Sequence, residues 1–394
     1  MKPSLFLVLS LIFAALNACD QEQGQGQTIT ITNDLTLPRS LETVEVRISD
    51  IVIPEGGQVE EMGVVDVNSG EVVITQQVDE DGDGTMDVLL FQPEIESKGE
   101  KKYRLEIIPK DRQPDVVDYC FSRFVPERTD DYAWENNRVA FRTFGPKAQQ
   151  MVEDSIKGGT LASGIDAWLK RVEYPIINKW YKRNDEKQGA YHKDEGEGLD
   201  NFHVGISRGV GGIAVKNDTT FAISKNFIKW ETIAVGPIRT EFVLTYADWE
   251  SNGIKISEKK RISLDYGSQL SKFLVEISGT DNLHAGLTVH EKDGSASQNE
   301  EAGYIAYWQP HDDSDLGTGI VVPKENWLAS EMFDSDVADW SNLYTNVEVD
   351  EGKAVYYAGF GWKKAGKITS SEEWNAYLED FAKKVNNPLK VTLN

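Results

Sequence analysis

Short runs of alternating apolar and polar residues recur along this chain, and they constrain its fold more than any other feature. Residues 28–32, 43–48, 103–108 and 239–246 all alternate in this way. Successive side chains of a β-strand point to opposite faces of a sheet, so a period of two predicts strands with one buried face. Glycines and short polar turns separate many of the runs, as expected between antiparallel strands. The sequence therefore predicts a mainly β protein.

The β pattern divides into two domains. Residues 28–118 predict a small N-terminal β-sandwich, and residues 134–394 predict a second, larger β domain. Residues 109–133 are rich in Asp, Pro and Arg and are expected to link the two. Helical patterns are few and cover residues 149–156 and 370–385. The second of these begins with a capping serine followed by early acids, which is typical of a helix start.

The first residues have the pattern of an export signal. A short basic start precedes an apolar run, residues 5–16, that is too short to span a bilayer. Residues 1–18 are therefore predicted to be a lipoprotein signal peptide, Cys19 to carry lipid and residues 19–27 to be a polar tether. Asn17 departs from the small residue usual at its position, which leaves plain secretory cleavage as the alternative. We expect an exported lipoprotein, facing the periplasm or anchored in the outer membrane, that meets the membrane only through its lipid.

The balance of charge argues against a nucleic-acid partner. The formal net charge is −24, from 65 acidic and 41 basic residues, whereas nucleic acid requires a broad basic face. A local group of cations can still dominate a pocket, so an anionic small substrate remains compatible with this charge. One such group lies within residues 170–183, although it could equally form a solvated basic face. Its members are Lys170, Arg171, Lys179, Lys182 and Arg183.

An acidic, glycine-containing turn has the spacing of the first part of a calcium-binding loop. Asp79, Asp81, Asp83 and Asp87 stand at relative positions 1, 3, 5 and 9, which would arrange oxygens around a hard cation. The acidic residue expected at position 12 is missing, since Leu90 stands there. Strand-like flanks place the turn at the tip of a hairpin, and ordinary solvated turns have similar composition. A structural calcium ion and an empty turn both remain open.

Residues 191–212 combine proton carriers with flexible backbone. Tyr191, His192 and His203 are interleaved with four carboxylates and several glycines, and Arg208 follows. Imidazole is the side chain whose ordinary pKa lies nearest neutrality, which makes it the usual proton carrier. The segment therefore predicts a site for proton transfer on a polar substrate, with Tyr191, His192, His203 and Arg208 as catalytic residues. The other histidines, His284, His290 and His311, are expected to be structural or peripheral.

Several short motifs together resemble an uncharacterised-domain family of exported proteins that are encoded with polysaccharide-degrading enzymes in glycan-feeding bacteria. The motifs occupy residues 189–192, 196–200, 207–209, 224–227, 236–240, 304–308 and 356–359. The resemblance spans residues 28–394 and extends to ulvan oligosaccharide dehydratases. It implies a galactose-mutarotase-like β-supersandwich, as in many polysaccharide lyases, for the larger, catalytic domain.

The resemblance implies removal of water across C4–C5 of a uronic acid, glucuronic or iduronic, at the non-reducing end of an ulvan-type oligosaccharide. Arg208 or Arg239 would neutralise the sugar carboxylate while charge develops beside it. A base among Tyr191, His192 and His203 would take the C5 proton, and another member of that set would protonate the departing O4. The chemistry requires no cofactor. The substrate-binding set would be Lys170, Arg171, Trp180, Lys225 and Arg239.

Three other functions remain open at this stage. A polysaccharide or oligosaccharide lyase would use the same elimination with a sugar as leaving group. A glycoside hydrolase would need two carboxylates across a cleft, for which Glu197 and Asp200 are the candidates. A non-catalytic glycan-binding lipoprotein would account for the ten tryptophans but not for paired histidines beside a tyrosine.

Overall fold

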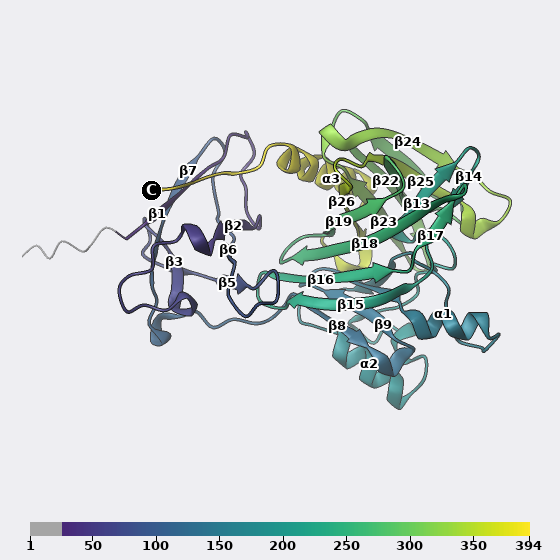
Figure 1. The fold of residues 1–394 in the computed structure, drawn as a ribbon, viewed down its shortest axis with the longest axis horizontal. Coiled ribbons are helices and arrows are strands. Elements are labelled where there is room, and N and C mark those ends of the chain that lie inside the picture. Colours follow the sequence, from purple (N-terminus) through teal and green to yellow (C-terminus); the bar gives the residue numbers. More distant parts are fainter. Residues whose placement is uncertain (1–25) are drawn as a thin grey trace, which may run out of the picture.

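The computed structural model describes residues 26–394, which form two β domains (Figure 1). The predicted signal peptide and Cys19 lie outside the described residues. The smaller domain is drawn in purple and blue at the left of Figure 1, and the larger one fills the right. The expected mainly β fold, a small N-terminal sandwich followed by a β-supersandwich, is confirmed. None of the helices within residues 26–394 is long and apolar enough to cross a membrane.

The N-terminal domain packs two antiparallel sheets face to face. The sheet orders are β27-β1-β7-β3-β4 and β2-β6-β5. The alternation seen in the sequence is real: Ile29 and Ile31 of β1, and Val44 and Val46 of β2, are buried in the shared core. The strands are β1 (Thr28–Thr32), β2 (Val44–Arg47), β3 (Met62–Asp66), β4 (Val72–Val73), β5 (Thr75–Val78), β6 (Val88–Phe91), β7 (Glu100–Ile107) and β27 (Lys390–Leu393).

The last strand of the chain belongs to the first domain. β27 pairs antiparallel with β1, with Ile29 opposite Leu393, and the yellow C-terminus returns to the purple domain in Figure 1. The side chains of Leu389 and Leu393 pack on the N-terminal core. The predicted range 134–394 for the larger domain is therefore wrong at its C-terminal end, because no local pattern shows which distant strand a terminal strand will join.

The larger domain stacks sheets around one extensive core. A nine-stranded sheet runs β15-β16-β18-β19-β26-β23-β22-β21 with β17 paired to β18, and two five-stranded sheets run β14-β13-β20-β25-β24 and β12-β11-β10-β9-β8. Side chains of all three sheets meet in this core, among them Phe141, Ile213 and Phe273.

The strands of the larger domain differ in length between its sheets, and the longest belong to the nine-stranded one. The small sheets contain β8 (Phe121–Val125), β9 (Asp131–Glu135), β10 (Ala140–Phe144), β11 (Asp166–Lys170), β12 (Gly198–Leu199), β13 (Val210–Asn217), β14 (Thr220–Ala222), β20 (Asn282–Thr288), β24 (Trp327–Phe333) and β25 (Asn342–Glu348). The large sheet contains β15 (Phe227–Ala234), β16 (Arg239–Tyr246), β17 (Trp249–Ser251), β18 (Ile254–Asp265), β19 (Leu270–Ser278), β21 (Ser295–Asn299), β22 (Tyr304–His311), β23 (Ser314–Val321) and β26 (Lys353–Trp362).

The predicted linker is partly sheet. β8 and the start of β9 fall within residues 109–133, and the two strands pair antiparallel from Phe121 to Val125. The linker is thus shorter than predicted, and the larger domain begins near Cys120, whose backbone bridges to Gly236.

Three α-helices accompany the sheets: α1 (Pro146–Glu153), α2 (Ile177–Glu186) and α3 (Ser371–Asn386). The predicted helix at 149–156 begins earlier than expected, because Pro146 is suited to a first helical turn. The prediction for α3 is confirmed, and the hydroxyl oxygen of Ser370 accepts a hydrogen bond from the Glu373 amide. α3 packs Trp374 and Leu378 against the large sheet.

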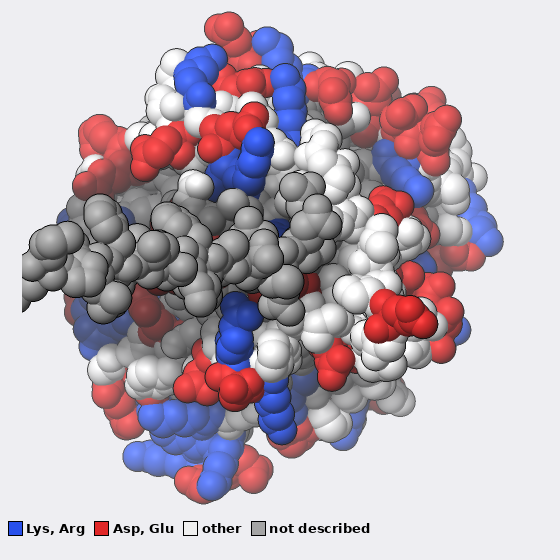
Figure 2. All heavy atoms as spheres, turned by 90° about the vertical axis from the view of Figure 1, so that its left-hand side faces the viewer, with Lys and Arg blue, Asp and Glu red and all other residues white. Residues whose placement is uncertain are grey.

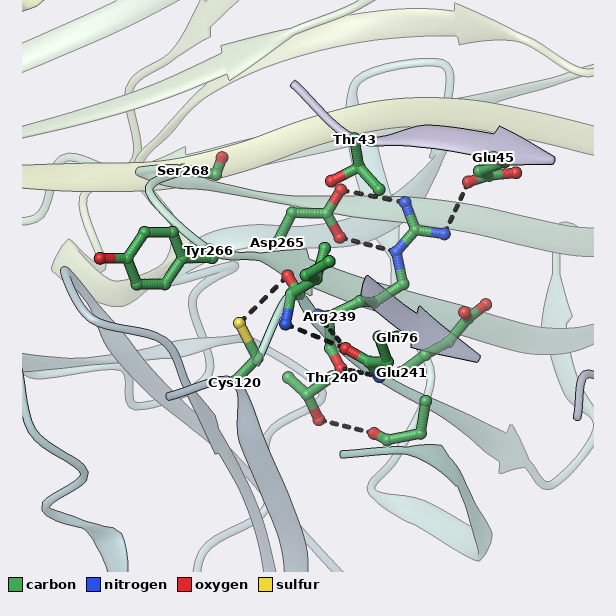
Figure 3. A network of polar contacts seen from close by, with 12 residues as sticks. Thr43, Glu45, Gln76, Cys120, Arg239, Thr240, Glu241, Asp265, Tyr266 and Ser268 are labelled. Atoms are coloured by element: carbon green, nitrogen blue, oxygen red, sulfur yellow. Dashed lines mark hydrogen bonds and ion pairs between the residues drawn. The ribbon is translucent and has the colours of Figure 1, made fainter. Parts of the chain in front are cut away.

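A polar network joins the two domains (Figure 3). The Gln76 side chain of β5 accepts hydrogen bonds from the amides of Ile238 and Arg239 at 2.9 and 2.8 Å, and it donates to the Arg239 carbonyl at 2.9 Å. The Arg239 guanidinium lies between Asp265 and Glu45, which come from different domains. Cys120 donates from Sγ to the Ile238 carbonyl over 3.2 Å, and burial raises the pKa of its thiol. Of these contacts, those of Gln76 and the pairing of Arg239 with Glu45 connect the two domains.

The end of the molecule that carries the N-terminal domain presents both signs of charge. Figure 2 shows lysines and arginines interspersed with aspartates and glutamates over this face. Neighbouring carboxylates therefore offset the positive charge locally.

Candidate active site

A cavity of about 480 Å³ opens where the sheet of β10 and β11 meets the loop at residues 202–206. Its wall combines two arginines, two carboxylates and an imidazole with apolar side chains. A pocket of this size in which charged groups of both signs come together is a candidate site for binding and catalysis. The charged and titratable members are Arg128, Arg142, Asp166, His203 and Asp339.

The strand register places the central ion pair of the cavity. Arg142 of β10 stands directly opposite Asp166 of β11, and its Nε donates to the Asp166 carboxylate over 2.6 Å. The same guanidinium donates from Nη2 to Asp200 over 2.8 Å and lies 3.7 Å from Asp131. All four side chains are buried. One buried arginine therefore faces three buried carboxylates.

This excess of carboxylates favours retention of a proton. Burial raises the pKa of Asp166 well above its ordinary value; Arg142 opposes the shift, and the field of Asp200 adds to it. Burial likewise raises the pKa of Asp131 to about 6. Oδ1 of Asp166 has no hydrogen-bond partner within the described part of the chain. Asp166 lines the cavity, and its carboxyl could donate a hydrogen bond if it is protonated.

Arg128 supplies a second cation with a different environment. It ends the short 3-10 helix η4 (Pro126–Arg128), and its Nη1 donates to the Thr129 hydroxyl over 2.8 Å. Its Nε donates to the Tyr191 hydroxyl over 2.8 Å. No carboxylate oxygen of residues 26–394 lies within 4.0 Å of its guanidinium. Arg128 therefore has capacity to pair with the carboxylate of a ligand.

His203 and Asp339 form a pair at the cavity. The Nε2 atom of His203 lies 3.2 Å from Oδ1 of Asp339, which belongs to the 3-10 helix η7 (Ala338–Trp340). Gly205 allows this approach: it has φ +52°, and a Cβ there would lie 1.9 Å from Oδ2 of Asp339. The His290 ring lies edge-on to His203, with centroids 5.2 Å apart. A carboxylate bound to one ring nitrogen orients the imidazole for proton transfer.

The structure separates the four predicted catalytic residues. His203 lines the cavity, and Tyr191 lies behind it, buried, with its hydroxyl on Arg128. His192 lies outside the cavity wall, with Nδ1 2.5 Å from the Asp200 carbonyl oxygen. Asp200 thus connects His192 to the Arg142 cluster, so His192 is placed to act only through its neighbours.

Arg208 is buried away from the cavity. Its guanidinium donates to the Ser163 hydroxyl at 3.0 Å and to the carbonyls of Ile213 and Ile206 at 3.1 and 2.9 Å. Burial lowers its pKa, although nearby Tyr344 and Glu258 oppose the shift. The expectation that Arg208 binds the substrate carboxylate therefore does not fit its position, because its donors are used by the protein. A cation within a glycine-rich segment could point into the core or into a pocket, and the sequence does not reveal which of these Arg208 does.

The predicted substrate-binding residues pair elsewhere. Lys170 is buried and donates to Glu135 over 2.7 Å. The Trp180 indole is buried and donates to Glu197 over 3.3 Å. The remaining pairs are Arg171 with Asp194, Lys225 with Glu153 and Arg239 with Asp265. None of these five lines the cavity that contains His203.

Glu197 and Asp200, the carboxylates considered for glycoside hydrolysis, are held separately. Glu197 accepts hydrogen bonds from Tyr174 and Lys179, each at 2.5 Å, whereas Asp200 accepts from Arg142. Neither lines the cavity. Their positions therefore do not favour a hydrolytic pair.

The acidic turn brings three of its four predicted ligands together. Asp79, Asp81 and Asp87 each offer an oxygen within 4.8 Å of the others. Asp83 is not in this group, and its Oδ1 accepts from the Thr85 amide over 2.7 Å. A set of carboxylate oxygens suits a hard cation such as calcium, so the donor chemistry fits the predicted ion.

Four charged residues of the cavity were not predicted: Arg128, Arg142, Asp166 and Asp339. Two of them had a signal in the sequence, because Arg142 and Asp166 lie within short apolar strands where a buried charge requires a partner. Arg128 and Asp339 lie in polar turns, and nothing in the local pattern distinguishes them from solvated residues.

Fold and cavity together define a mainly β, two-domain protein with a charged pocket in its larger domain. The chain belongs to the family described as "Domain of unknown function (DUF4861)", which matches residues 31–391. Membership of an uncharacterised-domain family is thereby confirmed. The chain is 51% identical over 394 residues, the full length of both proteins, to "Uncharacterized protein P7" of Formosa agariphila.

Two solved structures from Enterococcus faecalis are similar at a lower level. One is an alpha-mannosidase, with a TM-score of 0.49 and 11% identity over 94% of this chain and 46% of that one. The other is a protein in glycosyl hydrolase family 38, with a TM-score of 0.48 and 11% identity over 94% and 48%. The chain spans about half the length of both.

Proposed function

We propose that this protein is a carbon–oxygen lyase that removes water across C4–C5 of a uronic acid at the non-reducing end of an acidic oligosaccharide. One observation carries the proposal: a single cavity holds an arginine without a carboxylate partner, a buried aspartate with a raised pKa and a histidine–aspartate pair. These are the three kinds of group that the elimination requires. The resemblance to ulvan oligosaccharide dehydratases supports glucuronic or iduronic acid of ulvan-type oligosaccharides as the substrate.

The reaction balances without a cofactor. The base takes the proton from C5, and the electron pair of that bond forms the C4=C5 double bond. The C4–O4 bond breaks, and O4 leaves as water after it receives a proton from the acid. The products are one water molecule and an oligosaccharide with an unsaturated terminal uronate. Because hydroxide is a poor leaving group, the acid is as necessary as the base.

In this proposal Arg128 pairs with the uronate carboxylate. A carboxylate next to C5 makes that proton only weakly acidic, because removing it places further negative charge beside an existing one. A guanidinium on the carboxylate stabilises the enolate-like intermediate as its charge develops. Arg128 suits the role because its other contacts are to neutral oxygens of Tyr191 and Thr129. The role first expected for Arg208 or Arg239 thus passes to Arg128.

His203 is proposed as the base and Asp166 as the acid. Asp339 orients the His203 imidazole and stabilises it once protonated. Burial raises the pKa of Asp166, and one of its oxygens is not engaged by the described residues. A carboxyl with a raised pKa and an imidazole oriented by a carboxylate in one pocket are suited to act as acid and base. Tyr191 then positions Arg128, and His192 supports Asp200.

An oligosaccharide lyase remains the second candidate, because the same residues would eliminate a sugar in place of water. A non-catalytic glycan-binding protein is less well supported. Most tryptophans of the described chain are buried or half-buried; Trp230 is the exception, and it stacks on Phe124 with ring centroids 3.6 Å apart. Few indole faces are therefore available for sugar stacking.

The test is incubation of the purified protein with an oligosaccharide that ends in a saturated uronic acid, followed by mass spectrometry and ultraviolet absorbance. Loss of one water with a new absorbance from the conjugated double bond supports the dehydratase. Shorter products would identify a lyase or a hydrolase, and an unchanged mass would contradict catalysis on this substrate class. His203→Ala is the inactive reference, and Lys225→Ala, on the exposed Lys225–Glu153 pair, is the matched control.

We also propose export with a lipid on Cys19, so that the protein meets acidic oligosaccharides outside the cytoplasm. Mass spectrometry of the mature N-terminus tests this. A diacylated Cys19 supports the proposal, whereas an unmodified N-terminus would favour secretory cleavage.

A further inference from the structure

A second, larger cavity lies at the junction of the two domains. It has a volume of about 710 Å³ and is bounded on one side by residues 39–45 of the N-terminal domain. Strands β16, β18, β19 and β26 of the large sheet form its base, and helix α3 forms the remaining wall. Three separate elements of the fold thus contribute to this cavity, and none of its lining residues belongs to the cavity of His203.

Two cations in this cavity have no acidic partner. Arg239 is occupied by Asp265 and Glu45, as Figure 3 shows. Arg138 and Lys272 differ: within the described chain, no carboxylate oxygen approaches either of them to 4.0 Å. The Nε atom of Arg138 is also buried and without a hydrogen-bond partner among residues 26–394. Binding of an anion to such a guanidinium is favourable, because the anion accepts a hydrogen bond from a buried donor that otherwise has no partner.

The sheet register arranges polar and aromatic groups beside Lys272. Ser263 of β18, Lys272 of β19 and Tyr357 of β26 stand directly opposite one another on adjacent strands. The half-buried Tyr357 ring meets the edge of Phe381 from α3, with centroids 5.1 Å apart. A hydroxyl, an ammonium and an aromatic surface therefore lie in one row. Aromatic rings offer apolar surface to sugar rings, while hydroxyls and cations bind their polar substituents.

We propose that this interdomain cavity is a second binding site for an acidic saccharide, separate from the cavity of His203. A carboxylate or sulfate of the saccharide pairs with Arg138 and Lys272, and its ring rests against Tyr357 and Phe381. The site joins the two domains on one ligand, because residues 39–45 of the N-terminal domain line one side of it. Arg138 lies four residues before Arg142, which is at most about 13 Å along an extended chain. Arg138 lies in the turn that precedes β10, and Arg142 lies within β10.

The proposal goes beyond the proposed reaction, and binding tests it without turnover. Isothermal titration calorimetry on the His203→Ala protein would use a sulfated, uronic-acid-containing tetrasaccharide as the probe. A neutral tetrasaccharide of glucose is the comparison. We expect two sites for the acidic probe and weaker or no binding of the neutral one. Addition of Lys272→Glu should weaken the second site at least about tenfold, since it reverses a charge that contacts the anion.

Lys229→Glu is the matched control, because Lys229 is an exposed lysine of β15 outside both cavities. Arg138→Gln gives an independent measurement should charge reversal at Lys272 disturb folding. A single site in the His203→Ala protein that neither Lys272→Glu nor Arg138→Gln weakens would overturn the proposal. If the wild-type protein binds the acidic probe at the interdomain site but dehydrates no substrate, only the proposed reaction is refuted. Failure of the second binding site and failure of the reaction can therefore be distinguished.

Discussion

Arg128 donates from Nε to the hydroxyl oxygen of Tyr191 over 2.8 Å, and this contact connects the segment that the sequence identifies to the cavity that the fold creates. Tyr191 is buried, and its ring lies 5.3 Å from that of Trp168, so its hydroxyl is fixed in place. A residue first expected to transfer protons thus orients Arg128, the cation that we propose pairs with the substrate carboxylate.

The roles of Arg128 and Tyr191 can be separated by mutation. Arg128→Ala should lower kcat/KM roughly 100-fold or more, because it removes the charge that stabilises the intermediate. Tyr191→Phe should lower it only about tenfold, mainly through KM, because Arg128 remains but is less well held. Steady-state kinetics at several substrate concentrations measures both. An equal, near-complete loss of kcat in Tyr191→Phe would show instead that the phenol itself transfers a proton.

His203 and Asp339 should behave as a base and its orienting partner. His203→Ala is expected to lower kcat about 100- to 10,000-fold, the usual contribution of general base catalysis. Asp339→Asn should cause a smaller loss, because the imidazole stays in place without its carboxylate. The ultraviolet assay for the unsaturated uronate provides the rates, and thermal melting verifies the fold. Full activity in His203→Ala would refute the assignment of the base.

Because of Asp131, the free energy of unfolding should fall as the pH rises from about 4 to about 6. Its pKa is about 6 in the folded protein against an ordinary value of 3.8, so the native state binds more protons than the unfolded chain between these values. The stabilising effect of that proton is complete below about pH 4 and is lost as pH approaches and passes about 6, by up to about 3 kcal/mol. Asp131→Asn should flatten this part of the curve of unfolding free energy against pH. Parallel curves for the two proteins would contradict the shift.

The acidic turn should bind calcium and stabilise the N-terminal domain, as we propose from its three converging carboxylates. Calcium at about 100 times its dissociation constant should add about 2.7 kcal/mol, visible as a higher melting temperature that a chelator reverses. The double variant Asp79→Asn, Asp87→Asn should lose this response. Asp83→Asn should retain it, because Asp83 lies outside the group of three. An identical response in all three proteins would assign the effect to another site.

Arg208 should matter for stability more than for chemistry. Arg208→Met keeps much of the volume but leaves the Ser163 hydroxyl and the Ile213 and Ile206 carbonyls without their donor. We expect the free energy of unfolding to drop by about 2–5 kcal/mol. The folded fraction should keep a normal KM. A raised KM with unchanged stability would restore Arg208 as a substrate ligand.

Part of the candidate site could be predicted from the sequence. Glycines and acidic residues are enough to form a solvated loop. The imidazole of His203 and the phenol of Tyr191 are not needed for that purpose, so these two residues are recognisable in the sequence as candidates for a site. The sequence could not rank Arg208 against Arg128, since both are single cations near turns. Burial decided between them: Arg208 turns into the domain core, and Arg128 stays at the cavity.

The sequence by itself determined the class of fold, because a period of two in hydrophobicity is a local property that each strand carries. It also determined α3, whose cap at Ser370 and apolar spacing lie within one short segment. Only the tertiary structure decided that β27 joins β1, that Arg142 faces Asp166, and that Asp339 meets His203 across 136 positions of chain. Contacts between distant segments depend on how sheets stack and pair, and no local pattern of residues encodes that choice.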